Sequence, residues 1–148
     1  MRGLKGKVAI VPGGVTKIGQ AVVAALADAG VQVVVADIAE APVAMLSKEV
    51  VYHRCDLRSD DEIQALVRFA KDRFGRIDFL ANVAGEGILG KPEDISLEDV
   101  EACWRNLVFG RFCMCQEAGR RMLKQGTGSI VNIGSLASIT ALGRSHIA

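Results

Sequence analysis

Aromatic residues and an excess of charge are both scarce in this sequence. Phe, Trp and Tyr make up 5% of the 148 residues, and 18 basic side chains against 17 acidic ones leave a formal net charge of +1. Surfaces that bind nucleic acid need clustered cations, and those that bind single strands add aromatic rings on which bases stack. The composition therefore argues against nucleic acid as a partner.

Long hydrophobic runs are missing as well. The longest uninterrupted apolar run covers residues 21–27, far short of the roughly 20 residues that span a bilayer, and the run before Pro12 is too short for a secretory signal. We expect a cytoplasmic protein without membrane contact. Half of the residues are hydrophobic, and no repeat or linker divides them, so we expect a single domain over residues 1–148.

The four cysteines do not have the spacing of a zinc site. Cys55, Cys103, Cys113 and Cys115 form no paired C-x-x-C pattern. A free cysteine behaves as a small hydrophobe, so we expect buried thiols in a reducing compartment and no bound metal. A disulfide or a metal site formed by some of the four is the alternative.

Short apolar runs alternate with amphipathic stretches along the whole chain. The β-branched runs predict strands over 7–11, 31–37, 51–55, 77–85 and 129–133, and helical periodicity predicts helices over 18–30, 60–75 and 96–124. Ser59 and Glu62 have the spacing of a capping box at the second helix. This alternation predicts an α/β fold of the Rossmann type, a doubly wound parallel sheet of about five strands that is incomplete at its C-terminal end.

A glycine turn follows the first expected strand in "VPGGVTKIGQA", residues 11–21. Such a turn lets the backbone approach a pyrophosphate at a helix N-terminus, although an ordinary tight turn also uses glycine. Asp37, about twenty residues on, is placed to accept hydrogen bonds from a ribose 2′-hydroxyl. Its charge favours NAD over NADP, whereas Lys17 could reach a 2′-phosphate. A solvated strand-end aspartate is the alternative for Asp37.

A second acidic residue, Asp56, follows the third expected strand. It is positioned to face the amino group of an adenine at the same edge of the sheet. An acidic loop residue that only precedes a helix is the alternative.

Together these motifs resemble the short-chain dehydrogenase/reductase family over essentially the whole chain. Its T-G-x-x-x-G-x-G motif aligns with "PGGVTKIG" at 12–19, its N-N-A-G motif with "NVAG" at 82–85, its helix asparagine with Asn106, and its fifth strand and serine with "GSIVNIGS", which ends at Ser135. The resemblance implies that the cofactor is bound by Gly13, Lys17, Ile18, Gly19, Asp37, Asp56, Leu57, Asn82, Ala84 and Gly85.

The resemblance also implies a reaction, the transfer of hydride between NAD(H) and a small carbonyl or alcohol substrate. In it Ser135 would orient the substrate and Asn106 would support a proton relay. A strand-end hydroxyl and an amide at a helix kink are the structural alternatives for these two residues. The family's acid/base is a tyrosine with a lysine four residues later, because a free tyrosine titrates near about 10 and needs a neighbouring cation to work near neutrality.

The expected position of that tyrosine is 148 or 149, and position 148 is Ala148. The single tyrosine, Tyr52, lies in an expected strand and is expected to be a packing residue. We therefore expect turnover to be absent or very low, stability to be marginal, and the chain to self-associate or pair through the open edge of the strand at 129–133. A non-catalytic protein that binds a dinucleotide, or pairs with a full-length relative, is the second interpretation.

Two departures from the family pattern lie in the glycine turn. Pro12 replaces the motif's threonine and removes a backbone donor, so we expect a looser link to the fourth strand. Lys17 replaces its middle glycine, where a side chain could crowd the pyrophosphate or force an unfavourable backbone angle.

Overall fold

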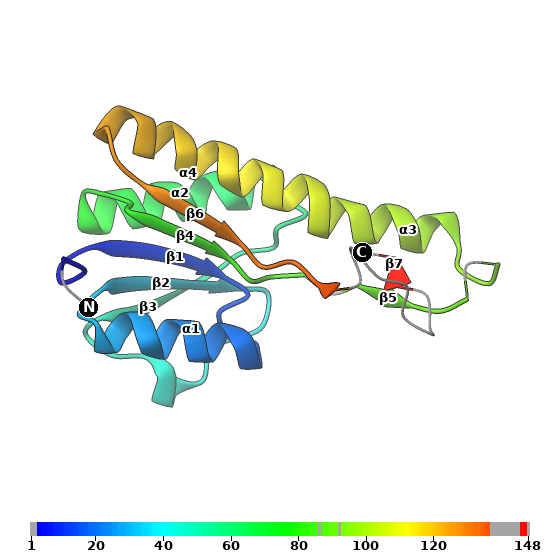
Figure 1. Ribbon diagram of the computed structural model, residues 1–148, viewed down its shortest axis with the longest axis horizontal. Coiled ribbons are helices and arrows are strands. Elements are labelled where there is room, and N and C mark those ends of the chain that lie inside the picture. The colour runs from blue at the N-terminus through cyan, green and yellow to red at the C-terminus, as the bar shows by residue number, and fades with distance from the viewer. Residues whose placement is uncertain (1–2, 86, 92, 137–145, 148) are drawn as a thin grey trace.

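Five parallel strands form the central sheet of the computed structural model, which describes residues 3–85, 87–91, 93–136 and 146–147 (Figure 1). The spatial order of these strands is β3-β2-β1-β4-β6. The strands are β1 (Val8–Pro12), β2 (Gln32–Asp37), β3 (Val50–Arg54), β4 (Phe79–Asn82) and β6 (Ser129–Asn132). A short antiparallel pair, β5 (Ile88–Leu89) with β7 (His146–Ile147), lies outside the sheet.

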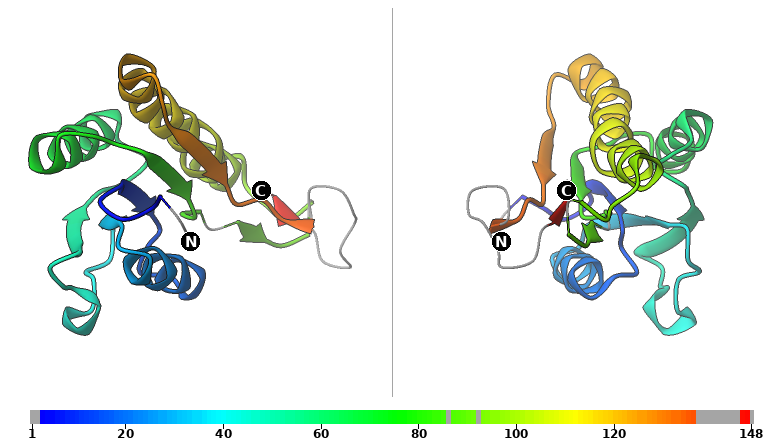
Figure 2. Two further views of the ribbon diagram at one scale, coloured as in Figure 1. Left: turned by 60° about the vertical axis from the view of Figure 1, so that its left-hand side comes forward. Right: turned by 90° about the vertical axis from the view of Figure 1, so that its right-hand side faces the viewer.

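Helices cover both faces of this sheet, α1 on one face and α2 and α4 on the other (Figures 1 and 2). The helical elements are α1 (Lys17–Asp28), a 3₁₀ turn (Val43–Met45), α2 (Asp60–Phe74), α3 (Leu97–Trp104), a π-helical turn (Arg105–Gly110) and α4 (Arg111–Gln125). No helix among the described residues is long and apolar enough to cross a membrane.

The central strands are apolar on both sides because both of their faces are covered. Alternate side chains of a strand point to opposite faces, so Ile10 joins the core under α2 and α4 while Ala9 joins the core under α1. All five residues of β1 are buried. The predicted fold class is confirmed, with strand bounds that differ from the expected ones by a few residues at most.

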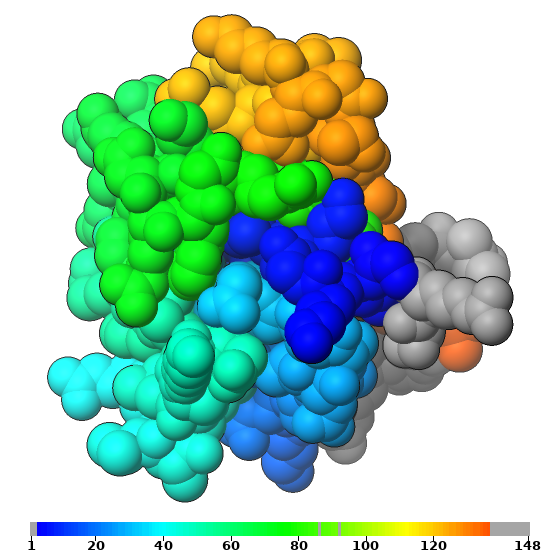
Figure 3. Space-filling model, turned by 90° about the vertical axis from the view of Figure 1, so that its left-hand side faces the viewer, coloured from blue at the N-terminus to red at the C-terminus, as the bar shows by residue number. Residues whose placement is uncertain are grey.

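The strand order reverses between β1 and β4. The chain runs outward from β1 through β2 to β3 and then returns to the other side of β1 with β4 and β6. Parallel strands all end at the same edge of the sheet, and a crevice opens there where the connections diverge. The opposite edge, where the strands begin, is seen in Figure 3, in which the N-terminal residues (blue) lie beside the green segment between α2 and β4.

The capping prediction for α2 is half right. Ser59 Oγ accepts a hydrogen bond from the Glu62 N–H at 3.3 Å, as a capping box requires. The Glu62 carboxylate does not return to Ser59; it accepts from the Asp56 N–H at 2.9 Å, and the Ser59 N–H donates to the Asp56 carbonyl at 3.0 Å. Glu62 therefore anchors the loop after β3.

The long helix predicted over 96–124 is interrupted by the π-helical turn. Ser96 Oγ accepts from the Asp99 N–H at 3.1 Å, which confirms the predicted start. Between α3 and α4, six residues take π geometry, which changes the direction in which side chains leave the helix. Such turns are commonly found at functional sites.

The four cysteines are free thiols. Cys55 and Cys103 are buried as expected, whereas Cys113 and Cys115 are only partly buried. Burial raises the pKa of the Cys55 thiol to about 12, so this side chain stays protonated and is a poor nucleophile at neutral pH. Among the described residues, no three His, Cys, Asp or Glu side chains are grouped to hold a metal ion.

Candidate functional site

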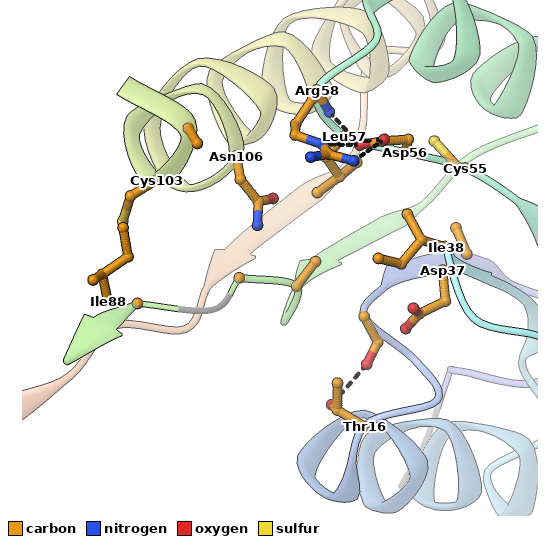
Figure 4. A pocket seen from close by; sticks show the side chains of 16 residues that line it. Thr16, Asp37, Ile38, Cys55, Asp56, Leu57, Arg58, Ile88, Cys103 and Asn106 are labelled. Carbon is orange, nitrogen blue, oxygen red and sulfur yellow. Dashed lines mark hydrogen bonds and ion pairs between the residues drawn. The ribbon is translucent and has the colours of Figure 1, made fainter. Parts of the chain in front are cut away.

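A cleft of about 670 Å³ opens at the carboxyl ends of the strands, beside the reversal between β1 and β4 (Figure 4). Its walls come from the loops after β1, β2, β3 and β4 and from the α3 region. The lining residues are Gly13, Thr16, Ala36, Asp37, Ile38, Cys55, Asp56, Leu57, Arg58, Ala84, Gly85, Gly87, Ile88, Ala102, Cys103 and Asn106.

The glycine turn after β1 is packed so closely that side chains do not fit. Gly13 has a φ of +78°, and a Cβ there would overlap the backbone of Ala84. A Cβ on Gly19 would overlap the Gly13 carbonyl oxygen. These contacts bring the first turn of α1 directly against the glycine turn.

The N-terminus of α1 presents free donors next to the cleft. Thr16 caps the helix, since its Oγ1 accepts from the Gly19 N–H at 3.1 Å and donates to the Gly13 carbonyl at 2.8 Å. The N–H groups of Lys17 and Ile18 donate to no acceptor within the described part of the chain. Unpaired donors and the positive end of the helix dipole together form an anion site.

Two of the effects expected from the sequence departures, a looser link to β4 at Pro12 and an unfavourable backbone angle at Lys17, are not observed. The Pro12 carbonyl accepts from the Val83 and Ala84 N–H groups at 3.1 and 2.8 Å, so the link between the glycine turn and β4 is held by the carbonyl that proline retains. Lys17 is the first residue of α1, and among the described residues only glycines have positive φ. The link to β4 is therefore not lost and the predicted backbone strain is wrong, whereas crowding of a pyrophosphate by the Lys17 side chain stays a prediction.

Asp37 ends β2 on the same side of the cleft as the glycine turn (Figure 4). Its Oδ1 accepts the Ala39 N–H at 3.1 Å, which shapes the turn after the strand. It forms no ion pair with any residue that the structure describes. The negative charge of Asp37 is therefore left without a cation at the wall of the cleft.

Asp56 also lines the cleft, but its charge is balanced by Arg58 (Figure 4). Arg58 Nη2 donates to Asp56 Oδ2 at 2.7 Å, and Arg58 Nε lies 3.0 Å from Oδ1 and 3.1 Å from Oδ2. The Arg58 N–H adds a bond to Oδ1 at 2.9 Å. These hydrogen bonds from Arg58 lower the pKa of Asp56.

The loop after β4 is held by an arginine of the long helix. Arg111 donates through Nε and Nη2 to the Ala84 carbonyl at 2.9 and 2.7 Å, and through Nη1 to the Ile133 carbonyl at 2.7 Å. Desolvation lowers the pKa of this partly buried guanidinium. Arg111 thus joins the ends of β4 and β6 and fixes the turn that leads into Gly85.

Asn82 lies below the cleft rather than in its wall. It is fully buried at the end of β4, where its Nδ2 donates to Asn132 Oδ1 at 2.8 Å. Its Oδ1 has no hydrogen-bond partner among the described residues. The Asn82–Asn132 hydrogen bond joins the ends of β4 and β6, so the role of Asn82 in the structure is to hold these two strands together.

The two residues expected to be catalytic lie in different surroundings. Asn106, in the π-helical turn, is half-buried and lines the cleft. Ser135 follows β6 on an exposed segment and is not among the lining residues. The expected tyrosine position, 148, lies outside the described residues.

The structure therefore gathers part of the predicted site. The predicted residues that line the cleft are Gly13, Asp37, Asp56, Leu57, Ala84, Gly85 and Asn106, and those that do not are Lys17, Ile18, Gly19, Asn82 and Ser135. Sequence reasoning missed Thr16, although a threonine just before an expected helix is a common capping signal. It also missed Arg58, whose pairing with Asp56 has no signal in the sequence.

Comparison with known proteins matches most of the chain to one family. Residues 7–145 fit the family described as short chain dehydrogenase. A D-threitol dehydrogenase from Mycolicibacterium smegmatis is 39% identical over 98% of this chain and 58% of its own length. An NAD-dependent glycerol dehydrogenase from Listeria innocua is 34% identical over 96% of this chain and 57% of its own length.

A solved structure is similar to this chain in both sequence and fold. The crystal structure of gox2181 is 34% identical and superposes with a TM-score of 0.89, over 96% of this chain and 59% of that one. The chain thus spans less than two thirds of the length of these relatives.

Proposed function

This chain belongs to the short-chain dehydrogenase/reductase family, and we propose that it is the dinucleotide-binding part of an NAD-dependent oxidoreductase that acts on a carbonyl or alcohol substrate. The observation that carries this proposal is the combination of two features, one next to the cleft and one in its wall. Free N–H groups at the start of α1 suit a pyrophosphate, and the unpaired carboxylate of Asp37 suits a ribose hydroxyl.

The residues of the cleft fit such a cofactor. Gly13 lines the cleft, and because neither Gly13 nor Gly19 has room for a side chain, α1 starts directly against the glycine turn. Asp56 and Leu57 form the wall at the adenosine end, and Ala84 and Gly85 continue the wall toward Asn106. When bound, the nicotinamide group supplies or accepts the hydride.

The chain's own residues would then orient the substrate. Asn106 projects into the cleft from the π-helical turn. We assign it a supporting role in a proton relay, in which its amide would hold a water molecule or a backbone group in place. Ser135 is assigned to the substrate oxygen. Tyr52 cannot serve as the acid/base, since its hydroxyl donates to the Asp37 and Ala39 carbonyls at 3.1 and 3.0 Å. We expect these 148 residues to bind the cofactor without turning over a substrate.

The choice of NAD over NADP tests the proposal. We expect the chain to bind NAD at least about tenfold more tightly than NADP, because a carboxylate close to a 2′-phosphate repels it strongly. Asp37→Asn keeps the shape, removes the charge and should bring the two affinities within about threefold of each other. Isothermal titration calorimetry measures both.

Glu40→Gln is the matched control, since Glu40 is an exposed acid three residues farther on that does not line the cleft. It should leave the preference for NAD unchanged. Equal affinity of the unaltered chain for NAD and NADP would contradict the assignment of Asp37, and failure to bind either would contradict the proposed function.

The edge of the sheet supports a second candidate, a non-catalytic protein that pairs with a full-length family member. Within the described residues β6 is hydrogen-bonded to β4 on one side only, and Val131 is 53% exposed. An unpaired strand edge is a template for another chain. Sedimentation of the chain mixed with a full-length relative should show a complex that contains both proteins. If the chain sediments in the mixture as it does alone, this candidate is excluded.

A further inference from the structure

The cation Arg111 lies behind the wall of the cleft without an acidic partner. It begins α4, is half-buried, and forms no ion pair with any residue that the structure describes. The guanidinium donates instead to two backbone carbonyls, those of Ala84 and Ile133, as described above. A cation that loses hydration on burial is usually paired with an acid. Arg111 therefore fixes the geometry of two chain segments rather than balancing a charge.

One side of the guanidinium lies directly against backbone that lines the cleft. Ala84 and Gly85 are both lining residues, and a Cβ on Gly85 would lie 2.9 Å from Arg111 Nη2, which donates to the Ala84 carbonyl. Gly85 also has a φ of +143°, a conformation that favours glycine. No side chain of Gly85 separates the guanidinium from the wall, so a displacement of Arg111 moves the wall with it.

The other side of the guanidinium fixes the exit of β6. Arg111 Nη1 donates to the Ile133 carbonyl, and the Ile133 N–H donates to the Asn82 carbonyl at 3.0 Å. Ile133 is thus held by α4 and by β4, two residues before Ser135. The π-helical turn that carries Asn106 leads directly into α4. Arg111 thereby sets the spacing between the wall of the cleft, the segment that leads to Ser135 and the helix that carries Asn106.

The adenosine end of the cleft is held by different contacts. Asp37 Oδ1 accepts from the Ala39 N–H, and the Asp56 N–H donates to the Glu62 carboxylate, as described above. These bonds shape the loops after β2 and β3, and Arg111 takes no part in them. The two ends of the cleft can therefore be disturbed separately.

In the proposed function, the end of the cleft where Ala84 and Gly85 continue the wall toward Asn106 receives the nicotinamide. We infer that Arg111 is a positioning residue for this nicotinamide end, which it shapes through the two carbonyls that it binds. This inference rests on the proposed binding of a dinucleotide. Without the guanidinium, the wall and the exit of β6 would move apart. The nicotinamide and its ribose would then lose the surface against which they pack, whereas the adenosine and the phosphates would not.

The ratio of the affinities for NAD and ADP tests this inference, because ADP lacks the nicotinamide and its ribose. The unaltered chain should bind NAD at least about tenfold more tightly than ADP. Arg111→Met removes the guanidinium and keeps an unbranched apolar stem. It should reduce the ratio to about threefold or less, while the affinity for ADP stays within about threefold of that of the unaltered chain. Calorimetry with both ligands gives the ratios.

Two further variants separate the hydrogen bonds of Arg111 from its charge. ADP carries more negative charge than NAD, so loss of charge alone would weaken ADP more and raise the ratio. Arg111→Lys keeps the charge, but an ammonium lacks the planar fork that reaches both carbonyls, and the ratio should fall as in Arg111→Met. Arg121→Met is the matched control on the same helix, since Arg121 forms no ion pair within the described part of the chain and does not line the cleft. It should leave the ratio unchanged.

A ratio that stays the same or rises in either Arg111 variant would overturn the inference. An equal loss of affinity for NAD and ADP in a folded variant would overturn it too, because the effect would then not be confined to the nicotinamide end. If circular dichroism shows that Arg111→Met does not fold, the ratio of Arg111→Lys decides. Equal affinity of the unaltered chain for NAD and ADP would overturn the inference and leave dinucleotide binding intact. If neither ligand binds, the proposed function fails and the inference fails with it.

Discussion

Replacing Gly19 with alanine is expected to abolish measurable binding of NAD. The new Cβ would overlap the Gly13 carbonyl oxygen and lie 2.6 Å from Gly14 Cα, both of which are backbone atoms. The turn cannot simply move away, because the Gly13 N–H donates to the Ala36 carbonyl at 2.8 Å and the neighbouring Pro12 carbonyl accepts from β4. The helix start and the glycine turn must therefore separate.

That separation displaces the Lys17 and Ile18 N–H groups from the position that suits a pyrophosphate. We expect the affinity for NAD to fall at least about 100-fold, and overpacking at this site to lower the free energy of unfolding by about 1–3 kcal/mol. Calorimetry measures the first effect and urea denaturation the second. Affinity within threefold of that of the unaltered chain would show that the turn does not form the cofactor site.

Gly119→Ala is the matched control for this substitution. Gly119 lies inside α4, and a Cβ there would meet no atom within 4 Å. Alanine has the higher helix propensity, so the free energy of unfolding should rise by about 0.5–1 kcal/mol while the affinity for NAD is unchanged. The same chemical change thus has opposite effects at two glycines of one chain.

The sequence was sufficient to predict the sheet, because its strands are defined by short-range patterns. Runs that are nearly all apolar, such as "VQVVVAD", are typical of strands with both faces covered, and the four central residues of β2 are buried in this way. Ser96 and Ser59 marked helix starts because a cap acts within one turn. These signals are local, and the structure confirms each of them.

Features that depend on contacts between distant segments could not be predicted in the same way. The role of the Pro12 carbonyl depends on where residues 83 and 84 pass, about 70 positions later. The prediction for Pro12 considered only the donor that proline lacks and did not consider the carbonyl that it keeps. The π-helical turn, too, interrupts a stretch whose periodicity is that of an ordinary helix.

The candidate site, too, has features that local spacing predicts and features that depend on contacts in space. Gly13 and Asp37 were found because a glycine turn and a strand-end acid have a characteristic spacing. Whether an acid remains available to a ligand depends on its neighbours in space. In the sequence Asp37 and Asp56 are both acids at the end of an expected strand, and nothing there separates them in this respect. The structure distinguishes them, since only Asp56 has a bound arginine.

At the opposite end of the sheet, Asp78 is a buried acid that joins β1 to β4. Its side chain is 3% exposed and accepts hydrogen bonds from the Val8 N–H at 3.0 Å, from Lys7 Nζ at 3.1 Å and from Arg76 Nε at 2.7 Å. Its own backbone donates to the Val8 carbonyl at 2.8 Å. Segments about 70 residues apart in the chain are thereby fixed at the start of both strands.

Burial alone would raise the pKa of Asp78, but the hydrogen bonds from Arg76, Val8 and Lys7 outweigh it, and the net effect lowers the pKa below its ordinary value. A carboxyl group whose pKa is lower in the folded state than in the unfolded state stabilises the fold above the unfolded pKa, near about 4 for an aspartate. That stabilisation is lost as the pH falls through the folded pKa. Protonation of Asp78 should therefore contribute to unfolding in acid.

Asp78→Asn is accordingly expected to lower the free energy of unfolding by about 2–4 kcal/mol at pH 7, because it removes the charge that two cations and a buried N–H share. The difference from the unaltered chain should begin to shrink below about pH 4, where the Asp78 carboxyl of the unfolded chain takes up a proton, and should be lost as the pH falls through the lower pKa of the folded state. Asp72→Asn, at an exposed acid of α2 with no ion pair among the described residues, should have little effect at either pH. Urea denaturation at pH 7 and below pH 4 tests both substitutions. A difference that stays constant with pH would show that packing, and not the charge of Asp78, holds β1 against β4.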